Sequence, residues 1–398
     1  MNVLMVTLAY DPAIAFGGPV KVVQNNAREL VRRGHHVTVY CTNRLDHKQK
    51  MTCRTVEHQD RGVRVVYHNA WFMPQWRGNF GPFISPGMIA YLVQEGRAFD
   101  LIHINEARTF STLVAGLYAQ AMKIPYVIQA HGSFRYGLRY RRMKKLFDLS
   151  IGRRIFYGAS KVIALTEGEI SECQAVGIGR DKMELIRNGF DFISWKINRE
   201  KRPAFRSKWG IPTDAVVVLF LGRIDKIKGP DILVEGFSKL KAQDLYCVFS
   251  GPDDDFQFVV KDLIKKHGLS DRVMFTGLLN EVEVQAAYAA ADIFALPSRF
   301  DTFPMAAVEA LASGLPVLIT ETCQIAHLIN GRAGIVVRPE SAEIADGLRE
   351  LLDPNVRDTY ARGARKLAEE EFSIEKTVDR LEEVYRQVIN QGGTRLGY

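Results

Sequence analysis

Two acidic residues, Asp301 and Glu309, lie at the start of and within a predicted helix in the second half of the chain. Pro304 suits the first turn of that helix, because its missing N–H would be unpaired there, and Gly314 suits its end. The acids are eight positions apart, about two helical turns, so both carboxylates can hold one polyhydroxylated ligand. The free N–H groups near 302–305 would face a phosphate brought to the same end.

Two cations, Arg223 and Lys228, lie on a predicted loop between a buried strand, 215–221, and a helix, 231–240. This order places a planar guanidinium and a point charge at the carboxyl end of a strand, where α/β sheets bind ligands. Fixed cations stabilise the negative charge that grows on a departing diphosphate. The pair alone is a weak indication, since surface Arg and Lys are common.

An acidic run, Asp253 to Asp255, also follows a predicted strand. A metal-dependent enzyme would use such carboxylates to hold a divalent ion. Arg223 and Lys228 already supply positive charge, and we interpret the run as a solvated turn. We therefore expect no metal and no other cofactor.

Two features in the first half of the chain also lie directly after predicted strands. Gly17 and Gly18 follow the first predicted strand, 3–8, where they fit either a ligand-binding turn or a plain tight turn. His131 follows another predicted strand, 126–129, and a lone histidine there is more often structural than catalytic.

The elements that position these residues form two series of alternating strands and helices. A strand at 3–8, a helix at 19–33 and a strand at 37–41 are typical of a parallel doubly wound sheet. The alternation restarts at 215–221, after a polar stretch, 188–209, that we interpret as a linker. The sequence therefore predicts an α/β chain with two domains.

The stretch from Ser298 to Val317 resembles the acid-x7-Glu signature of glycosyltransferase family 4, and the likeness covers essentially the whole chain. The family's Gly-Arg…Lys-Gly pattern is matched by Gly222, Arg223, Lys228 and Gly229. Two positions depart from the family: Asp301 stands where Glu is usual, and Arg187 replaces a proline before Asn188.

The resemblance implies the GT-B arrangement, in which two Rossmann-like doubly wound parallel-sheet domains face a central cleft. It assigns residues 1–190 to an acceptor-side domain and 191–372 to a nucleotide-sugar-binding domain. Residues 373–398 would form a helix that crosses back to the first domain.

The resemblance also implies transfer of a sugar from a nucleoside-diphosphate sugar, UDP- or GDP-linked, to an acceptor hydroxyl with retention. The acceptor would be a glycan or a lipid-linked molecule in cell-surface glycan assembly, such as capsule, lipopolysaccharide or glycolipid. The implied catalytic residues are Arg223, Lys228, His131 and Asp301. The implied donor-binding residues are Gly17, Gly18, Gly222, Thr302, Phe303, Met305 and Glu309.

Composition sets outer limits on these interpretations. The chain has 398 residues, 47% of them hydrophobic, and none of its apolar runs approaches the ~20 residues that span a bilayer. The start, 2–10, lacks the features of a signal peptide, so we expect a cytoplasmic protein. Five cysteines without a CxxC pair suggest neither disulfides nor a zinc site.

A basic segment, 135–154, holds eight of the Lys and Arg residues behind the net charge of +8. It fits a peripheral helix resting on anionic lipid, each cation contributing roughly 1 kcal/mol near the surface. It also fits an ordinary surface helix whose apolar stripe joins the core, which we prefer. We do not expect a nucleic-acid partner, because no aromatic-basic platform accompanies the charge.

Two other classes of function stay open. A GT-B sugar-nucleotide epimerase would share the phosphate-binding cations but use no acceptor. A non-catalytic scaffold at a membrane would keep the basic segment and lose donor turnover. The aromatic connection 71–83 is either an acceptor-facing loop or a packed Ω-loop.

Overall fold

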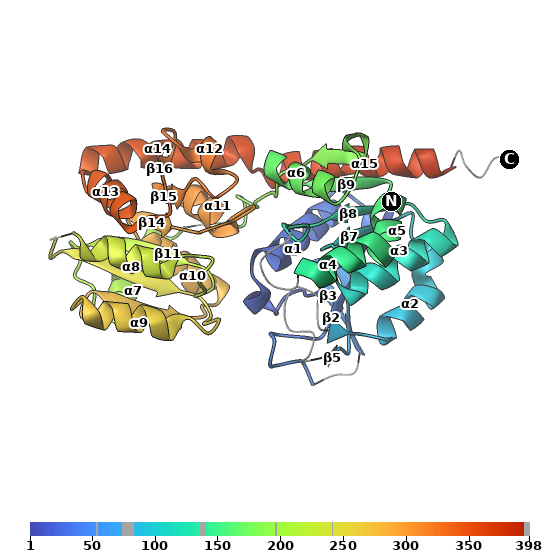
Figure 1. Cartoon of the computed structure of the whole chain (residues 1–398), viewed down its shortest axis with the longest axis horizontal. Coiled ribbons are helices and arrows are strands. Elements are labelled where there is room, and N and C mark those ends of the chain that lie inside the picture. Colours follow the sequence, from blue (N-terminus) through green and yellow to red (C-terminus); the bar gives the residue numbers. More distant parts are fainter. Residues whose placement is uncertain (53–54, 74–82, 136–140, 196, 241, 394–398) are drawn as a thin grey trace. The chain divides into compact units, whose positions relative to one another are not determined.

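The computed structural model describes residues 1–52, 55–73, 83–135, 141–195, 197–240 and 242–393. The chain divides into two compact units (Figure 1). Unit 1 comprises Met1–Gly189 and Ile374–Tyr398, and unit 2 comprises Phe190–Ser373. Each unit has a largely parallel sheet flanked by helices, which confirms the predicted α/β class.

The described part of unit 1 contains an eight-stranded sheet in the order β10-β9-β8-β7-β1-β2-β4-β3, parallel except for β3. The direction in which successive strands are added to the sheet reverses between β1 and β7, which makes a topological switch point. The strands are β1 (Asn2–Val6), β2 (His36–Thr42), β3 (Thr55–Asp60), β4 (Val63–His68), β7 (Leu101–Asn105), β8 (Tyr126–Gln129), β9 (Lys161–Ala164) and β10 (Met183–Leu185). A separate short hairpin pairs β5 (Trp71–Phe72) with β6 (Phe83–Ile84).

Two apolar clusters cover the two faces of this sheet. Successive residues of β1 alternate between them: Leu4 and Val6 belong to one, Val3 and Met5 to the other. This is the two-residue period of a strand buried on both faces.

The helices of unit 1 are η1 (Ile14–Phe16), α1 (Gly18–Arg32), α2 (Gly87–Glu95), η3 (Gly96–Ala98), α3 (Phe110–Met122), α4 (Arg141–Phe147), η4 (Asp148–Gly152), α5 (Arg153–Gly158), α6 (Glu167–Ala175), η5 (Arg180–Lys182) and α15 (Ile374–Gly393).

The last helix, α15, is red in Figure 1 and belongs to unit 1. Its apolar face, including Val378, Leu381 and Val388, packs into the same cluster as Val3 and Met5. The face is therefore core, as its helical spacing predicts.

The described part of unit 2 contains a six-stranded parallel sheet in the order β13-β12-β11-β14-β15-β16. Its strands are β11 (Val216–Leu221), β12 (Leu245–Ser250), β13 (Val273–Gly277), β14 (Ile293–Leu296), β15 (Val317–Thr320) and β16 (Gly334–Val337). Its helices are η6 (Arg199–Lys201), α7 (Arg202–Lys208), α8 (Pro230–Ser238), α9 (Gln257–Lys266), α10 (Glu281–Ala290), α11 (Met305–Ala312), α12 (Ala326–Ile329), α13 (Ser341–Leu351) and α14 (Pro354–Glu371).

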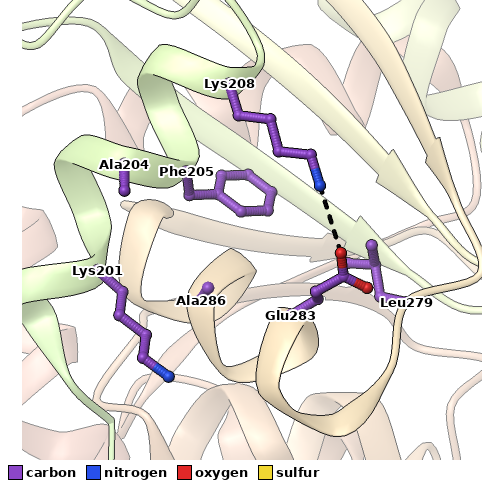
Figure 2. Close-up of a pocket in the computed structure, with 7 residues that line it drawn as sticks. All are labelled: Lys201, Ala204, Phe205, Lys208, Leu279, Glu283 and Ala286. Atoms are coloured by element: carbon purple, nitrogen blue, oxygen red, sulfur yellow. Dashed lines mark hydrogen bonds and ion pairs between the residues drawn. The ribbon is translucent and has the colours of Figure 1, made fainter.

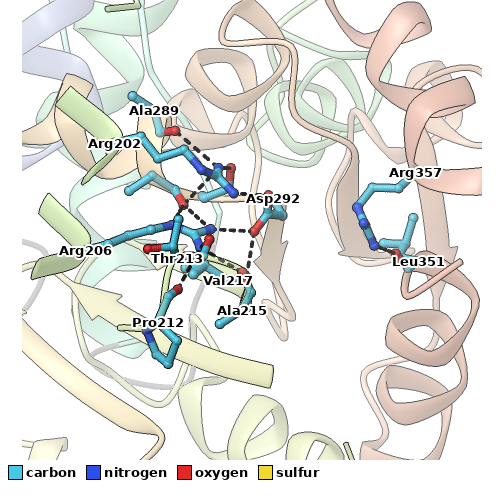
Figure 3. Close-up of polar contacts among 12 residues, drawn as sticks. Arg202, Arg206, Pro212, Thr213, Ala215, Val217, Ala289, Asp292, Leu351 and Arg357 are labelled. Carbon is cyan, nitrogen blue, oxygen red and sulfur yellow. Dashed lines mark hydrogen bonds and ion pairs between the residues drawn. The ribbon is translucent and has the colours of Figure 1, made fainter. Parts of the chain in front are cut away.

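The interpretation of 188–209 as a linker is wrong for its second half. Residues 202–208 form α7, and Pro203 lies in the helix's first turn, where a missing N–H costs nothing. Arg206 is buried and donates to Asp292 Oδ2 at 2.8 Å and to four carbonyl oxygens, those of Pro212, Thr213, Ala215 and Ala290 (Figure 3). These bonds fix α7 to the rest of unit 2, so this segment is part of the unit and not a linker.

The basic segment does not bury its whole apolar stripe. Phe147 packs against the core of unit 1, whereas the side chains of Leu146 and Leu149 are 69% and 74% exposed. Two further apolar residues of the segment, Tyr136 and Leu138, lie outside the described residues. Among the described helices, none is long and apolar enough to cross a membrane.

Candidate functional site

In unit 2, two loops leave the same edge of the sheet because their strands are neighbours. β11 and β14 pair in parallel, with Val218 opposite Ile293. The loop after β11, 222–229, and the loop after β14, 297–304, therefore begin side by side at the carboxyl edge, where α/β sheets place ligands.

The two loops touch backbone to backbone at Gly229. A Cβ atom on this residue would lie 2.1 Å from the carbonyl oxygen of Pro297, and its φ is +72°. Only glycine fits that approach and that conformation. The contact holds the cation-bearing loop against the acid-bearing loop.

The approach brings together two of the predicted catalytic residues. The Lys228 ammonium forms an ion pair with the Asp301 carboxylate, and their side chains are 20% and 11% exposed. The main-chain N–H of Lys228 donates to Asp225 Oδ1 at 2.8 Å, which fixes the base of the lysine. An anion that binds Lys228 must therefore compete with Asp301.

Arg223 lies on the same loop but has other partners. Its guanidinium pairs with Asp225 at 3.0 Å and with Asp254 at 3.1 Å, and its side chain is 43% exposed. Asp253 accepts the N–H groups of Phe256 and Gln257 at the start of α9. In the part of the chain that the structure describes, no three His, Cys, Asp or Glu side chains are grouped so that they could hold a metal ion.

The residues at the start of α11 present their backbone rather than their side chains. The side chains of Thr302, Phe303 and Met305 are buried, and the Phe303 ring packs edge-on against Phe372. A ligand at this end would therefore meet main-chain N–H groups, which favour anions at a helix N-terminus.

Glu309 lies one turn further into α11 and is oriented by a buried tyrosine. The Tyr288 hydroxyl lies 3.0 Å from Glu309 Oε2 and 2.9 Å from the carbonyl oxygen of Ala306. Burial and the neighbouring carboxylate raise the pKa of Tyr288, so its hydroxyl keeps its proton. One phenol proton is thus shared between two acceptors.

In unit 1, Gly17 ends the loop after β1 and caps α1. Its φ of +82° and ψ of −150° suit glycine, and Gly18 begins the helix. The loop is held by the Tyr10 hydroxyl, which donates to Asp60 at 2.7 Å, while Arg28 donates to both oxygens of that carboxylate.

His131 follows β8 with a φ of +50°, an uncommon conformation for a non-glycine residue. Its Nε2 lies 3.2 Å from Asn105 Oδ1, and its Nδ1 has no hydrogen-bond partner among the described residues. Burial lowers the pKa of His131 to about 4, so the ring is neutral near pH 7. Glu169 accepts the N–H of Gly132 and thereby fixes the turn.

Both halves of the chain match known glycosyltransferases. Residues 16–192 match the family "Glycosyltransferase Family 4", and residues 201–367 match "Glycosyl transferases group 1". A D-inositol 3-phosphate glycosyltransferase of Saccharomonospora viridis is 31% identical over 396 residues, which cover 94% of this chain and 90% of that protein. The chain belongs to the group 1/family 4 glycosyltransferases.

Two further comparisons agree with this placement. The glycosyltransferase is 27% identical to the mannosylfructose-phosphate synthase of Agrobacterium fabrum, over 76% of this chain and 71% of that protein. The crystal structure of Anabaena HepE in complex with UDP and glucose superposes with a TM-score of 0.78 at 20% identity, covering 97% of this chain and 100% of HepE. The predicted GT-B fold is confirmed.

Hollows elsewhere in unit 2 of the glycosyltransferase do not include the predicted site. One, of about 200 Å³, lies between α7 and α10 and is lined by Lys201, Phe205, Lys208 and Glu283 among others (Figure 2). Another, of about 400 Å³, is lined by residues that include Lys239 and Arg349. Neither hollow is lined by Arg223, Lys228 or Asp301, so the candidate site is identified by the charged side chains of its two loops.

Sequence reasoning missed two carboxylates in unit 1 of the glycosyltransferase, the half-buried Glu106 and the buried Glu169. Glu106 follows β7 at the switch point, accepts the N–H of Leu8 and the hydroxyl of Thr7, and burial raises its pKa to about 8. Burial likewise raises the pKa of Glu169 to about 7. Position at a strand end could have indicated Glu106, whereas Glu169 has the sequence signature of a helix cap after Thr166.

Proposed function

We propose that this glycosyltransferase moves a sugar from a UDP- or GDP-linked donor to an acceptor hydroxyl, with retention of the anomeric configuration. The observation that carries the proposal is the pairing of Lys228 with Asp301 beside Arg223, on two neighbouring loops of one sheet edge. This arrangement offers cations to a diphosphate and a carboxylate to the attached sugar at the same place.

In the proposed reaction the bond between sugar C1 and the diphosphate oxygen breaks, and its electron pair leaves with the diphosphate. Lys228 and Arg223 stabilise that charge. The acceptor oxygen bonds to C1 on the same face, and its proton passes to the leaving phosphate oxygen. The chain then needs neither a protein nucleophile nor a metal.

The carboxylates would hold the donor on either side of the reacting bond. When the diphosphate takes Lys228, Asp301 becomes available to accept hydrogen bonds from sugar hydroxyls. Glu309, oriented by Tyr288, would accept those of the ribose. His131, Gly17 and Gly18 receive their donor-side roles from the family resemblance, and His131 would act as a neutral imidazole.

UDP accompanies glucose in the HepE structure, and two relatives are named for phosphorylated molecules, which supports a nucleotide donor and a polar acceptor. The family resemblance alone supports a role in cell-surface glycan assembly. Whether the base is uracil or guanine is the first question for experiment.

The decisive experiment follows release of free nucleotide from UDP-, GDP- and ADP-sugars with EDTA present. We expect one donor to be hydrolysed slowly, and Arg223→Ala/Lys228→Ala to abolish this. A matched control, Lys239→Ala/Arg349→Ala, removes the same charge from the hollow of about 400 Å³, which does not include the candidate site, and should keep the activity. If no donor in the panel releases free nucleotide, and no nucleotide stabilises the protein against thermal unfolding, the proposal is refuted.

A second proposal concerns where the acceptor lies. Leu146 and Leu149 are exposed beside the exposed cations Arg142, Lys145 and Arg153, a combination suited to anionic lipid. The glycosyltransferase would then be a cytoplasmic protein that binds the inner face of the membrane and meets a lipid-linked acceptor there.

Vesicle sedimentation tests this contact. The wild type should sediment with phosphatidylglycerol vesicles and not with phosphatidylcholine vesicles, and Leu149→Asn should reduce sedimentation. Phe258→Asn removes another strongly exposed apolar side chain, in unit 2, and should have no effect. Equal sedimentation of all three proteins would argue against the contact.

A further inference from the structure

Arg299 occupies a position between the two loops that the proposed mechanism does not use. Its guanidinium binds Asp231 in α8 with two bonds, Nη1 to Oδ1 at 2.8 Å and Nη2 to Oδ2 at 2.7 Å. Nη1 also donates to the carbonyl oxygen of Lys226 at 2.6 Å. Its main-chain N–H donates to the carbonyl oxygen of Ile227 at 2.7 Å.

These partners bracket Lys228. Lys226 and Ile227 precede the lysine directly, and Asp231 follows it in the first turn of α8. Arg299 therefore holds the chain on both sides of Lys228, while it is itself two residues from Asp301. One residue thus contacts the chain on both sides of the lysine and lies close in sequence to the lysine's partner carboxylate.

The chemistry of the contact suits this purpose. A planar guanidinium that binds a carboxylate with two parallel bonds fixes direction as well as distance, which a lysine ammonium does not. The side chains of Arg299 and Asp231 are partly buried, so solvent screens them less than a surface pair. The hydrogen bonds that Arg299 donates to the Asp231 carboxylate are the largest cause of the raised pKa of Arg299.

We propose that Arg299, held by Asp231, is a positioning residue that sets Lys228 for the diphosphate of the donor. The inference rests on the proposed function, because it assigns Lys228 to a nucleoside diphosphate. It adds a residue whose effect on binding passes through Lys228, and it predicts that the two residues are energetically coupled.

A double-mutant cycle measures that coupling. Affinities for UDP and for GDP are determined by calorimetry for the wild type, Arg299→Gln, Lys228→Ala and the double variant. We expect Arg299→Gln to weaken binding of the preferred nucleotide about tenfold. In the Lys228→Ala background the same change should have an effect of less than about twofold, because the residue that it positions is gone.

Matched variants separate positioning from general loss of structure. Asp231→Asn should weaken binding as much as Arg299→Gln, and Arg299→Lys, which keeps the charge but loses the fork, should fall between wild type and Gln. Arg349→Gln breaks an exposed pair with Asp346 in the same unit and should leave affinity unchanged. Thermal unfolding of each variant shows whether unit 2 stays folded, and if Arg299→Gln unfolds, Asp231→Asn replaces it in the cycle.

The outcomes are distinguishable. A wild type that binds neither nucleotide would overturn the proposed function and this inference with it. A wild type that binds, with Arg299→Gln binding equally well, would overturn the inference alone. Independent losses that multiply in the double variant would show that Arg299 acts on stability or on the ligand directly and not through Lys228.

Discussion

Lys228 and Asp301 form an ion pair although 73 residues separate them in the chain. The pair has two consequences for a donor that carries a diphosphate and a sugar. It restrains the ammonium and the carboxylate before the ligand arrives, and an anion that binds the ammonium competes with the carboxylate for it.

Replacing the acid should therefore change binding and turnover in opposite directions. In Asp301→Asn the ammonium loses its competitor, and we expect the free nucleoside diphosphate to bind about threefold more tightly, the order expected for a partly exposed pair. Sugar transfer should fall by at least about tenfold, because an amide accepts sugar hydroxyls less well than a carboxylate. Calorimetry and a turnover assay measure the two effects, and a variant with weaker nucleotide binding would contradict the competition.

The orientation of Glu309 by Tyr288 can be tested without changing a charge. Tyr288→Phe removes the hydroxyl that lies 3.0 Å from the carboxylate, and we expect the donor KM to rise about threefold while kcat changes little. Tyr360→Phe, on α14 of the same unit, serves as the control. An unchanged KM in Tyr288→Phe would show that Glu309 needs no such support.

Glu169 should make the stability of unit 1 dependent on pH. Its pKa rises from an ordinary value near 4.5 to about 7 in the folded state because the carboxyl is buried. The folded state thus holds the proton more tightly, so this contribution to stability is complete below about pH 4.5 and is lost as pH rises through about 7.

The size of that change is about 3 kcal/mol in the free energy of unfolding. Urea unfolding of the wild type and of Glu169→Gln at pH 5 and pH 8 measures it, since the variant lacks the titrating group. The exposed Glu340→Gln is the control. If the difference between wild type and Glu169→Gln is the same at both pH values, Glu169 does not titrate in this range.

The network in Figure 3 should control the stability of unit 2. Asp292 is the carboxylate that both Arg202 and Arg206 bind, at 2.7 and 2.8 Å, and it also accepts the N–H of Val217. Asp292→Asn leaves the buried guanidinium of Arg206 without its counter-charge, and we expect a loss of about 3 kcal/mol in unfolding free energy.

Denaturant unfolding followed by tryptophan fluorescence measures this loss. Arg365→Gln, which breaks an exposed pair on α14, should cost less than about 0.5 kcal/mol. A loss in Asp292→Asn no larger than in that control would mean that the carbonyl oxygens around Arg206 compensate its charge by themselves.

Part of the fold was predictable because it depends on local sequence patterns. Apolar runs of strand length such as 216–221, glycines at turns and helical spacing in 374–388 each depend on neighbouring residues alone. β3 was missed because Glu57, His58 and Gln59 are exposed on an edge strand and give no apolar signal. α7 was misread because Pro203 signals a break unless its place in the first turn is known.

The sequence by itself determined which residues carry charge at strand ends, namely Arg223, Lys228 and Asp301, and it placed the chain among the family-4 glycosyltransferases. Only the tertiary structure decided that Lys228 meets Asp301, that Arg299 holds the segment around the lysine, and that Leu146 and Leu149 stay exposed. Those facts depend on which strands are neighbours and which faces find a partner, and both are set by packing between segments far apart in the chain.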